Sequence, residues 1–127
     1  MRKTIELSNG AVTLESNAAT PLIAKRIFGI DYFAYFQNAD EVDIGNQTTN
    51  LMKLTFVMAK QAEVSARISG ASEQLNELFK LKEEDFVAWS MGIEFTEMAS
   101  ILLPFAMQVW AGNNETSSTP KNQQDRQ

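Results

Sequence analysis

The chain contains no cysteine and no histidine among its 127 residues. Without cysteine it forms no disulfide bond, and it offers no thiolate nucleophile and no thiolate ligand for zinc or an iron–sulfur cluster. Without histidine it has no imidazole for a Ser-His-Asp triad or for a metal site. These two absences exclude most hydrolase and metalloenzyme classes. We therefore expect neither a cofactor nor a metal.

Positive charge is scarce and scattered. Eleven Lys and Arg residues stand against 16 Asp and Glu residues, which gives a formal net charge of −5. Because no basic cluster is present to neutralise phosphates, we do not expect nucleic-acid binding. The longest apolar run, residues 101–107, is too short to cross a bilayer, and no apolar run follows the basic start. We expect a cytoplasmic protein that does not enter a membrane.

The length and the 44% hydrophobic content fit one small globular domain. Its first 16 residues predict a β-hairpin, because residues 4–7 and 12–15 alternate in polarity around Ser8-Asn9-Gly10. Asparagine and glycine between alternating runs favour a tight turn. Two strands alone are only marginally stable, so the hairpin must pack on the rest of the chain or pair with another chain.

From Thr20 onward the sequence is typical of helices. Thr20 is expected to be the N-cap of a first helix, with Pro21 in its first turn and Gly29 closing it in the left-handed conformation. Asp31 can cap a short aromatic turn over residues 32–36. The apolar stripe of the first helix is expected to consist of Leu22, Ile23 and Ile27.

The middle of the chain predicts a loop over residues 37–47 and then a central helix over residues 48–62. The apolar face of this helix is expected to contain Leu51, Leu54, Met58 and Ala62, and its narrow polar side Asn50, Lys53, Lys60 and Gln61. Ser72 can cap a short helix, and the charged run at 82–85 leads into another, which Gly92 separates from the last helix.

The last helix, expected over residues 94–110, is apolar over an arc of about 200° at about 100° per residue. Pro104 must kink or divide it, since proline cannot donate to the carbonyl of Ser100. So wide an arc indicates either the central core helix or a face that meets another chain. From periodicity alone, the candidate partner-binding residues are Phe95, Met98, Leu102, Phe105 and Trp110.

Two other features bear on function. The six methionines are either core filler or part of an adaptable binding surface. The carboxylates Glu83, Glu84 and Asp85 are consecutive and suit a solvated helix start, and no catalytic partner for Glu94 and Glu97 is visible. We therefore predict that the chain is not an enzyme and has no catalytic residues.

The composition changes after Trp110. Residues 111–127 contain almost nothing apolar and are expected to be disordered, because they cannot bury enough surface to offset their ordering entropy. The predicted organisation is a mainly α-helical domain over residues 1–110, with the hairpin in residues 1–16, followed by a tail or linker over residues 111–127.

Segments along almost the whole chain resemble the tail assembly chaperones of long-tailed bacteriophages and prophages of Gram-positive bacteria. The resemblance rests on the order and spacing of these segments. They are KTIELSNG (3–10), VTLESNAATP (12–21), IFGIDYF (27–33), FVMAKQA (56–62), DFVAW (85–89), WAGN (110–113) and SSTPK (117–121).

The resemblance implies a morphogenesis factor that acts by binding. Members of this family coat the tape measure protein and recruit major tail protein while the tail tube grows, and they are absent from the mature virion. Their gene also yields a longer product by ribosomal frameshifting. The family would place this chain in the host cytoplasm, and we expect it to self-associate through the hairpin edge or the last helix.

Two alternatives stay open. Pro120-Lys121-Asn122 can be encoded by CCA AAA AAC, which contains the slippery heptamer A AAA AAC, or it can be an ordinary piece of a polar tail. The chain can also be a structural virion subunit, such as a head–tail connector or a tube-associated protein, instead of an assembly chaperone.

Overall fold

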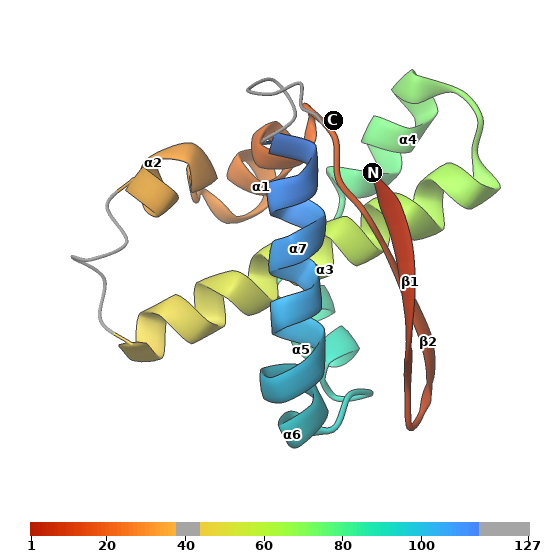
Figure 1. Cartoon of the computed structure of the whole chain (residues 1–127). Helices are drawn as coiled ribbons and strands as arrows, with labels where there is room; N and C mark the ends of the chain where they lie inside the picture. The colour runs from red at the N-terminus through yellow and green to blue at the C-terminus, as the bar shows by residue number, and fades with distance from the viewer. Residues whose placement is uncertain (38–43, 115–127) are drawn as a thin grey trace, which may run out of the picture.

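In the computed structural model, which describes residues 1–37 and 44–114, an antiparallel hairpin precedes a set of helices (Figure 1). The fold class is mainly α with an N-terminal β-hairpin, as the sequence predicts. The elements are β1 (Arg2–Leu7), β2 (Gly10–Glu15), α1 (Thr20–Phe28), α2 (Tyr32–Gln37), α3 (Ile44–Arg67), α4 (Ala71–Leu78), α5 (Glu83–Ser90), α6 (Phe95–Glu97), the π-helical segment η2 (Met98–Leu102) and α7 (Leu103–Asn114).

The hairpin forms as predicted and packs on its own chain. Its register places Leu7 opposite Gly10, so Ser8 and Asn9 form the turn. Gly10 has φ of +132°, a conformation that side chains disfavour. Leu14 of β2 is fully buried, and β2 lies along α3. The hairpin is thus stabilised by a helix beneath it, which removes the need for a second chain.

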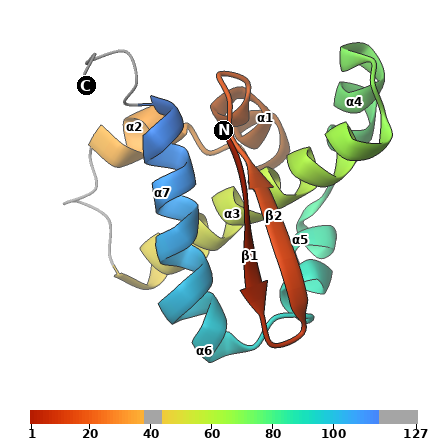
Figure 2. The ribbon, with the colours of Figure 1, turned by 45° about the vertical axis from the view of Figure 1, so that its right-hand side comes forward.

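Helix α3 is the centre of the fold. In both views it crosses behind the hairpin and α7, which lie side by side (Figure 1, Figure 2). It begins at Ile44 and ends at Arg67, so it is longer at both ends than the predicted helix. The end of the predicted loop at 37–47 is therefore helical, while residues 38–43 of that loop lie outside the described residues.

The predicted inner face of α3 is confirmed, with one correction on its polar side. Leu54, Met58 and Ala62 are buried. Gln61, expected on the polar side, is only 5% exposed. Its Oε1 accepts a hydrogen bond from the Thr20 hydroxyl at 2.7 Å, and its Nε2 donates to Asn17 Oδ1 at 3.4 Å. A glutamine can lie in the interior because these partners replace water.

The start of α1 corrects two predictions, and its end confirms one. Ala19, not Thr20, is the N-cap, and Thr20 is fully buried. Leu22, expected in the apolar stripe, is 68% exposed, because no described element covers that side of α1. Gly29 closes the helix with φ of +73°, as predicted. Asp31 Oδ1 accepts from the backbone N–H groups of residues 33 and 34, which confirms the predicted cap of α2.

The caps of α4 and α5 differ from each other. Gly70, not Ser72, is the N-cap of α4, because the helix begins one residue before the serine that was expected to cap it. At α5 the Lys82 backbone N–H donates to Asp85 Oδ2 at 2.8 Å. Three acidic residues in the first turn of α5 also favour the helix, through the positive end of its dipole.

The hydrogen-bond pattern of the last helical run changes from α-helical to π-helical just before Pro104. In η2 the Leu103 N–H bonds to the Met98 carbonyl, five residues earlier, instead of the usual four. Proline has no N–H for the Ser100 carbonyl, so a local change of hydrogen bonding is expected just before it. The predicted division is observed as this π-helical segment between α6 and α7. The run continues to Asn114, beyond the predicted end at 110, and residues 115–127 lie outside the described residues.

The core lies where α1, α2, α3, η2 and α7 meet the hairpin. Among the described residues, no single helix is both long and apolar enough to span a membrane. Helix α5 and residues 95–112 reach that length and apolarity only when taken together, and the two are bent by 106° relative to each other. The largest fully buried side chains are Tyr32, Phe56, Leu14, Leu54, Met58, Leu102, Val57 and Val109.

Candidate binding surface

The five candidate residues of the last helix differ widely in burial. Met98, Leu102 and Trp110 belong to the core, with exposed fractions of 2%, 0% and 8%. Phe105 is half-buried against the core. Phe95 is 75% exposed. Most of the wide apolar arc therefore packs in the core, while Phe95 at its start and Ile101 in its middle, which is 38% exposed, face outward.

Aromatic rings explain why Trp110 is covered. The Trp110 ring lies 5.4 Å from the ring of Phe36, 6.2 Å from Phe33 and 6.3 Å from Tyr32, measured between centroids. Tilted aromatic pairs at these separations are favourable. Helix α2 thus covers the far half of α7 and removes Trp110 from the surface available to a partner.

An exposed apolar groove lies at the other end of the run. We call it the α5–α6 groove, and its volume is about 280 Å³. Three of its large apolar side chains face solvent, with exposed fractions of 50% for Val87, 83% for Met91 and 75% for Phe95. Its lining residues are Met52, Val87, Ser90, Met91, Ile93, Phe95 and Met98.

The groove is built where the chain turns between α5 and α6. Helix α5 ends at Ser90, so Met91 and Ile93 lie on the connection to α6, and Met98 and Met52 lie deeper, from η2 and α3. The groove therefore combines one continuous stretch, residues 87–98, with Met52 of α3, which is distant in sequence. Three of its seven lining residues are methionines, whose flexible side chains adapt to irregular partners.

The tip of the hairpin holds this connection in place. The Glu97 carboxylate accepts hydrogen bonds from the Ser8 backbone N–H at 3.0 Å and from the Ser8 hydroxyl at 2.8 Å. Asn9 Nδ2 donates to the carbonyl of Gly92 at 3.2 Å. The turn of the hairpin thus fixes both sides of the segment that carries Ile93 and Phe95, which keeps the groove preformed.

Several of the acidic residues considered above have partners in the fold. Glu83 forms an ion pair with Lys53 at 3.2 Å, and Asp85 caps α5. Within residues 1–37 and 44–114, no three acidic side chains gather in a way that could hold a metal ion. Glu94 and Glu97, which are three residues apart, differ in surroundings: Glu97 accepts hydrogen bonds from Ser8, and Glu94 is exposed.

The sequence pattern gave no sign of most of the groove. Val87, Met91 and Ile93 follow no helical stripe, since two of them lie outside a helix and Val87 lies on the outer side of α5. One signal was present: Met91 stands next to Gly92, in a break between helices, where a large apolar side chain has few neighbours to cover it. Of the methionines, Met58 and Met98 are core and Met91 is surface.

Searches of the chain against protein-family models, curated proteins and solved structures find no match. The groove and the charge of the chain are therefore the observations on which a function can be argued.

Proposed function

We propose that this chain is a phage tail assembly chaperone that binds the tape measure protein and helps recruit major tail protein during tail tube assembly. The observation that carries the proposal is the α5–α6 groove, in which Val87, Met91 and Phe95 present a preformed apolar surface to solvent. The resemblance of the sequence to that family supplies the identity of the partners.

The groove suits one stripe of an apolar helix. Amphipathic helices bind in apolar grooves through side chains spaced three or four residues apart, and methionines at the contact accommodate variation along such a stripe. A long tape measure helix with exposed apolar stripes would aggregate unless covered. Many copies of a small domain, each covering a short length, would keep it soluble.

The charge of the chain supports a role as a soluble cover. Its net charge of −5 disfavours association between coated complexes. In this proposal the chain works by binding and not by chemistry, resides in the host cytoplasm and leaves before the virion is mature. Self-association, which would bring copies together along the partner, remains part of the proposal.

The frameshifted longer product is a separate element of the proposal. The residues after Asn114, where α7 ends, would link the helical domain to an extension that contacts major tail protein. Reading the gene tests this directly: the proposal expects A AAA AAC across the codons of Pro120, Lys121 and Asn122, followed by an overlapping open frame. A gene with neither feature removes the longer product.

The main test is co-expression with the tape measure protein of the same phage, scored by recovery of a soluble complex. The wild-type chain should keep the tape measure protein soluble and co-purify with it. Met91→Glu places a charge in the groove at an 83% exposed position, so it should abolish co-purification while the fold is retained. Leu22→Glu is the matched control, because Leu22 is 68% exposed but lies on α1, outside the groove.

Two outcomes would count against the proposal. A tape measure protein that stays insoluble and unbound beside the wild-type chain would contradict the chaperone role. Mass spectrometry of purified virions that finds this chain in stoichiometric amount would favour the alternative, a structural virion subunit such as a head–tail connector or tube-associated protein.

A further inference from the structure

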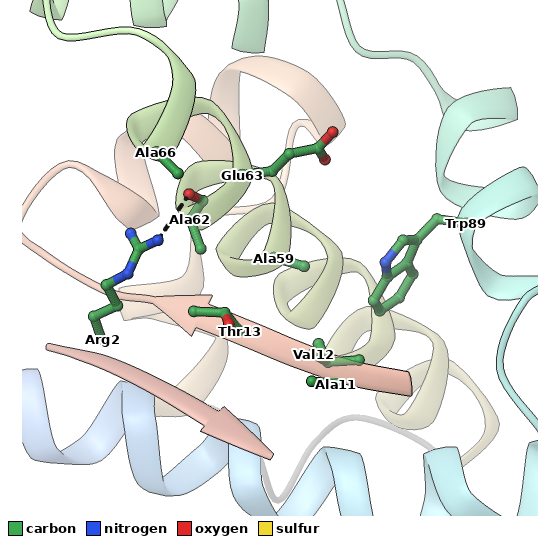
Figure 3. Close-up of a pocket in the computed structure, with 9 residues that line it drawn as sticks. All are labelled: Arg2, Ala11, Val12, Thr13, Ala59, Ala62, Glu63, Ala66 and Trp89. Carbon is green, nitrogen blue, oxygen red and sulfur yellow. Dashed lines mark hydrogen bonds between the residues drawn. The ribbon is translucent and has the colours of Figure 1, made fainter. Parts of the chain in front are cut away.

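A second groove lies on a different part of the molecule, between the hairpin and α3 (Figure 3). Its volume is about 330 Å³, and it shares no lining residue with the α5–α6 groove. The side toward β2 is formed by Ala11, Val12 and Thr13. The other sides are α3, with three alanines, and Trp89 of α5 (Figure 3).

The hydrogen-bond pattern of the hairpin shows what β2 presents to this groove. The backbones of Met1 and Ser16 exchange two hydrogen bonds, of 2.6 and 2.8 Å, so they form a hydrogen-bonded pair. Such pairs alternate along an antiparallel ladder. In this register Thr13, opposite Thr4, is in a non-hydrogen-bonded pair, and so is Ala11. Their N–H and C=O groups therefore point away from β1, toward the groove.

These outward groups lack a partner among the described residues. No other backbone group and no side chain of the described residues forms a hydrogen bond with the backbone N–H or C=O groups of Ala11 and Thr13. A free strand edge of this kind is a template for another strand. The two residues are about 7 Å apart along β2, at about 3.4 Å per residue, which matches the spacing of alternate residues in an added strand.

The floor of the groove leaves room for that strand. Ala59, Ala62 and Ala66 of α3 lie beside β2, and none of them carries a side chain beyond Cβ (Figure 3). A third strand could lie against α3 over these positions if its own inward side chains were small. Large residues on this part of α3 would fill the same space.

The two ends of the groove limit the length of the added segment. At one end the Arg2 guanidinium donates to Glu15 Oε1 at 2.7 Å and to the Ala62 carbonyl at 3.3 Å, which closes the space between β2 and α3. At the other end stands Trp89, whose indole N–H donates to no described residue. An entering backbone carbonyl could accept from that N–H. The site is therefore a short one.

We infer that the free edge of β2 binds an extended peptide segment of another protein, with small side chains on its inward face, as a third strand of the hairpin. This surface goes beyond the proposed function, since it is independent of the α5–α6 groove. A second copy of the chain fits less well, because both edges of its own hairpin are flanked by helices, α3 along β2 and α7 along β1 (Figure 2). A free segment has no such helix to collide with α3.

The test uses the full chain and a probe peptide, acetylated and amidated Ala-Thr-Ala-Thr-Ala. Titration of the ¹⁵N-labelled chain with this peptide should shift the backbone amide signals of Ala11 and Thr13 and the indole N–H signal of Trp89. The same two backbone amides should exchange more slowly with solvent when the peptide is bound, because each then donates a hydrogen bond.

Two variants of the hairpin form a matched pair. Thr13→Pro removes an outward N–H from the β2 edge, and Thr4→Pro removes one from the β1 edge directly opposite; both also remove the Thr4–Thr13 hydroxyl contact of 2.7 Å. Proline is tolerated on a strand edge whose N–H faces outward. Thr13→Pro should weaken peptide binding about fivefold, as expected for the loss of one hydrogen bond, and Thr4→Pro should leave it unchanged.

Three results would overturn the inference. The first is a peptide that shifts no signal at Ala11 and Thr13. The second is equal binding by the two proline variants. The third is protection of the two amides that rises with the concentration of the chain alone, accompanied by a dimer in sedimentation, because a second copy would then occupy the edge. If Thr13→Pro fails to fold, the signals of the wild-type chain still decide the matter.

Discussion

The two halves of the last helical run are similar in composition and opposite in environment. From Leu102 to Trp110 the apolar side chains are covered by α2, α3 and the hairpin, and Leu102 and Val109 are fully buried. At the start of the run, Phe95 is 75% exposed, and Met91 and Val87 beside it are exposed as well. One apolar helix thus contributes to the core at one end and to a surface groove at the other.

The width of an apolar arc on a helix indicates how much of its surface is buried, but it does not indicate whether its own chain or a partner buries it. A soluble domain rarely leaves clustered large apolar side chains exposed unless a partner uses them. The covered half has α2 as its neighbour, and the rings of Phe33 and Phe36 contact Trp110. The uncovered half has no such neighbour among the described residues, which makes it the part of the run to associate with binding.

The largest expected effect of a substitution is at the buried end of the last helical run. Leu102→Asp places a carboxylate at a fully buried position, so it should reduce the free energy of unfolding by about 4 kcal/mol or more and leave the chain unfolded. Phe95→Asp, on the same helical run, should change it by less than about 0.5 kcal/mol. Urea unfolding followed by far-UV circular dichroism measures both.

The opposite result would reassign Leu102. A Leu102→Asp chain that is folded and has lost partner binding would make this residue part of an interface, as its periodicity alone allowed. A Phe95→Asp chain that unfolds would show that the groove end is core in solution.

Local chemistry explains which parts of the fold could be predicted from the sequence. The hairpin, the left-handed Gly29 and the Asp31 cap each depend on a few neighbouring residues, and all three are confirmed. The inner face of α3 was predictable because one periodic stripe meets one core. These features need no knowledge of what packs against them.

The features that were missed depend on neighbours that are distant in sequence. Gln61 is interior because Thr20 and Asn17 bond to it across more than 40 positions of the chain. Leu22 is exposed because no described element covers that side of α1, which a helical stripe alone cannot show. The candidate list for the last helix contained Phe95 and lacked Met91 for the same reason, since the groove forms only where residues 87–98 fold beside Met52 of α3.

The covered end of the run should also respond to pH, because both tyrosines of the chain, Tyr32 and Tyr35, are buried beside it. Burial raises the pKa of the Tyr32 hydroxyl above its ordinary value of 10.0, the neighbouring Tyr35 raises it further, and a backbone hydrogen bond at Leu54 lowers it by less. The hydroxyl donates to the carbonyl of Asn50. The folded state therefore keeps the proton longer than the unfolded state does.

The sign follows from proton binding. Below about pH 10 both states hold the proton, and the pKa shift has no effect on stability. Above it the unfolded state loses the proton first, so the free energy of unfolding should fall by about 1.4 kcal/mol per pH unit from Tyr32. Urea midpoints between about pH 9 and about pH 11 measure this slope. Tyr32→Phe should flatten it, and an equal slope in that variant would contradict the assignment.

The smallest expected effect concerns the contact that joins the hairpin to the groove. Glu97→Ala removes the acceptor for the Ser8 N–H and hydroxyl, both at an exposed site, so it should cost about 0.5–1.5 kcal/mol. Glu94→Ala is the control, because the Glu94 side chain makes no capping hydrogen bond and is exposed. Chemical denaturation of the two variants measures the difference between them.

Glu97→Ala also tests whether the hairpin tip supports binding to the tape measure protein. If the hairpin tip keeps the segment with Ile93 and Phe95 in a preformed position, then Glu97→Ala should weaken the complex as well as the fold, since a looser groove must be ordered on binding. A variant that loses stability but binds as tightly as the wild-type chain would show that the groove needs no support from the hairpin. The uncovered end of the run would then be a surface held by α5 and η2 alone.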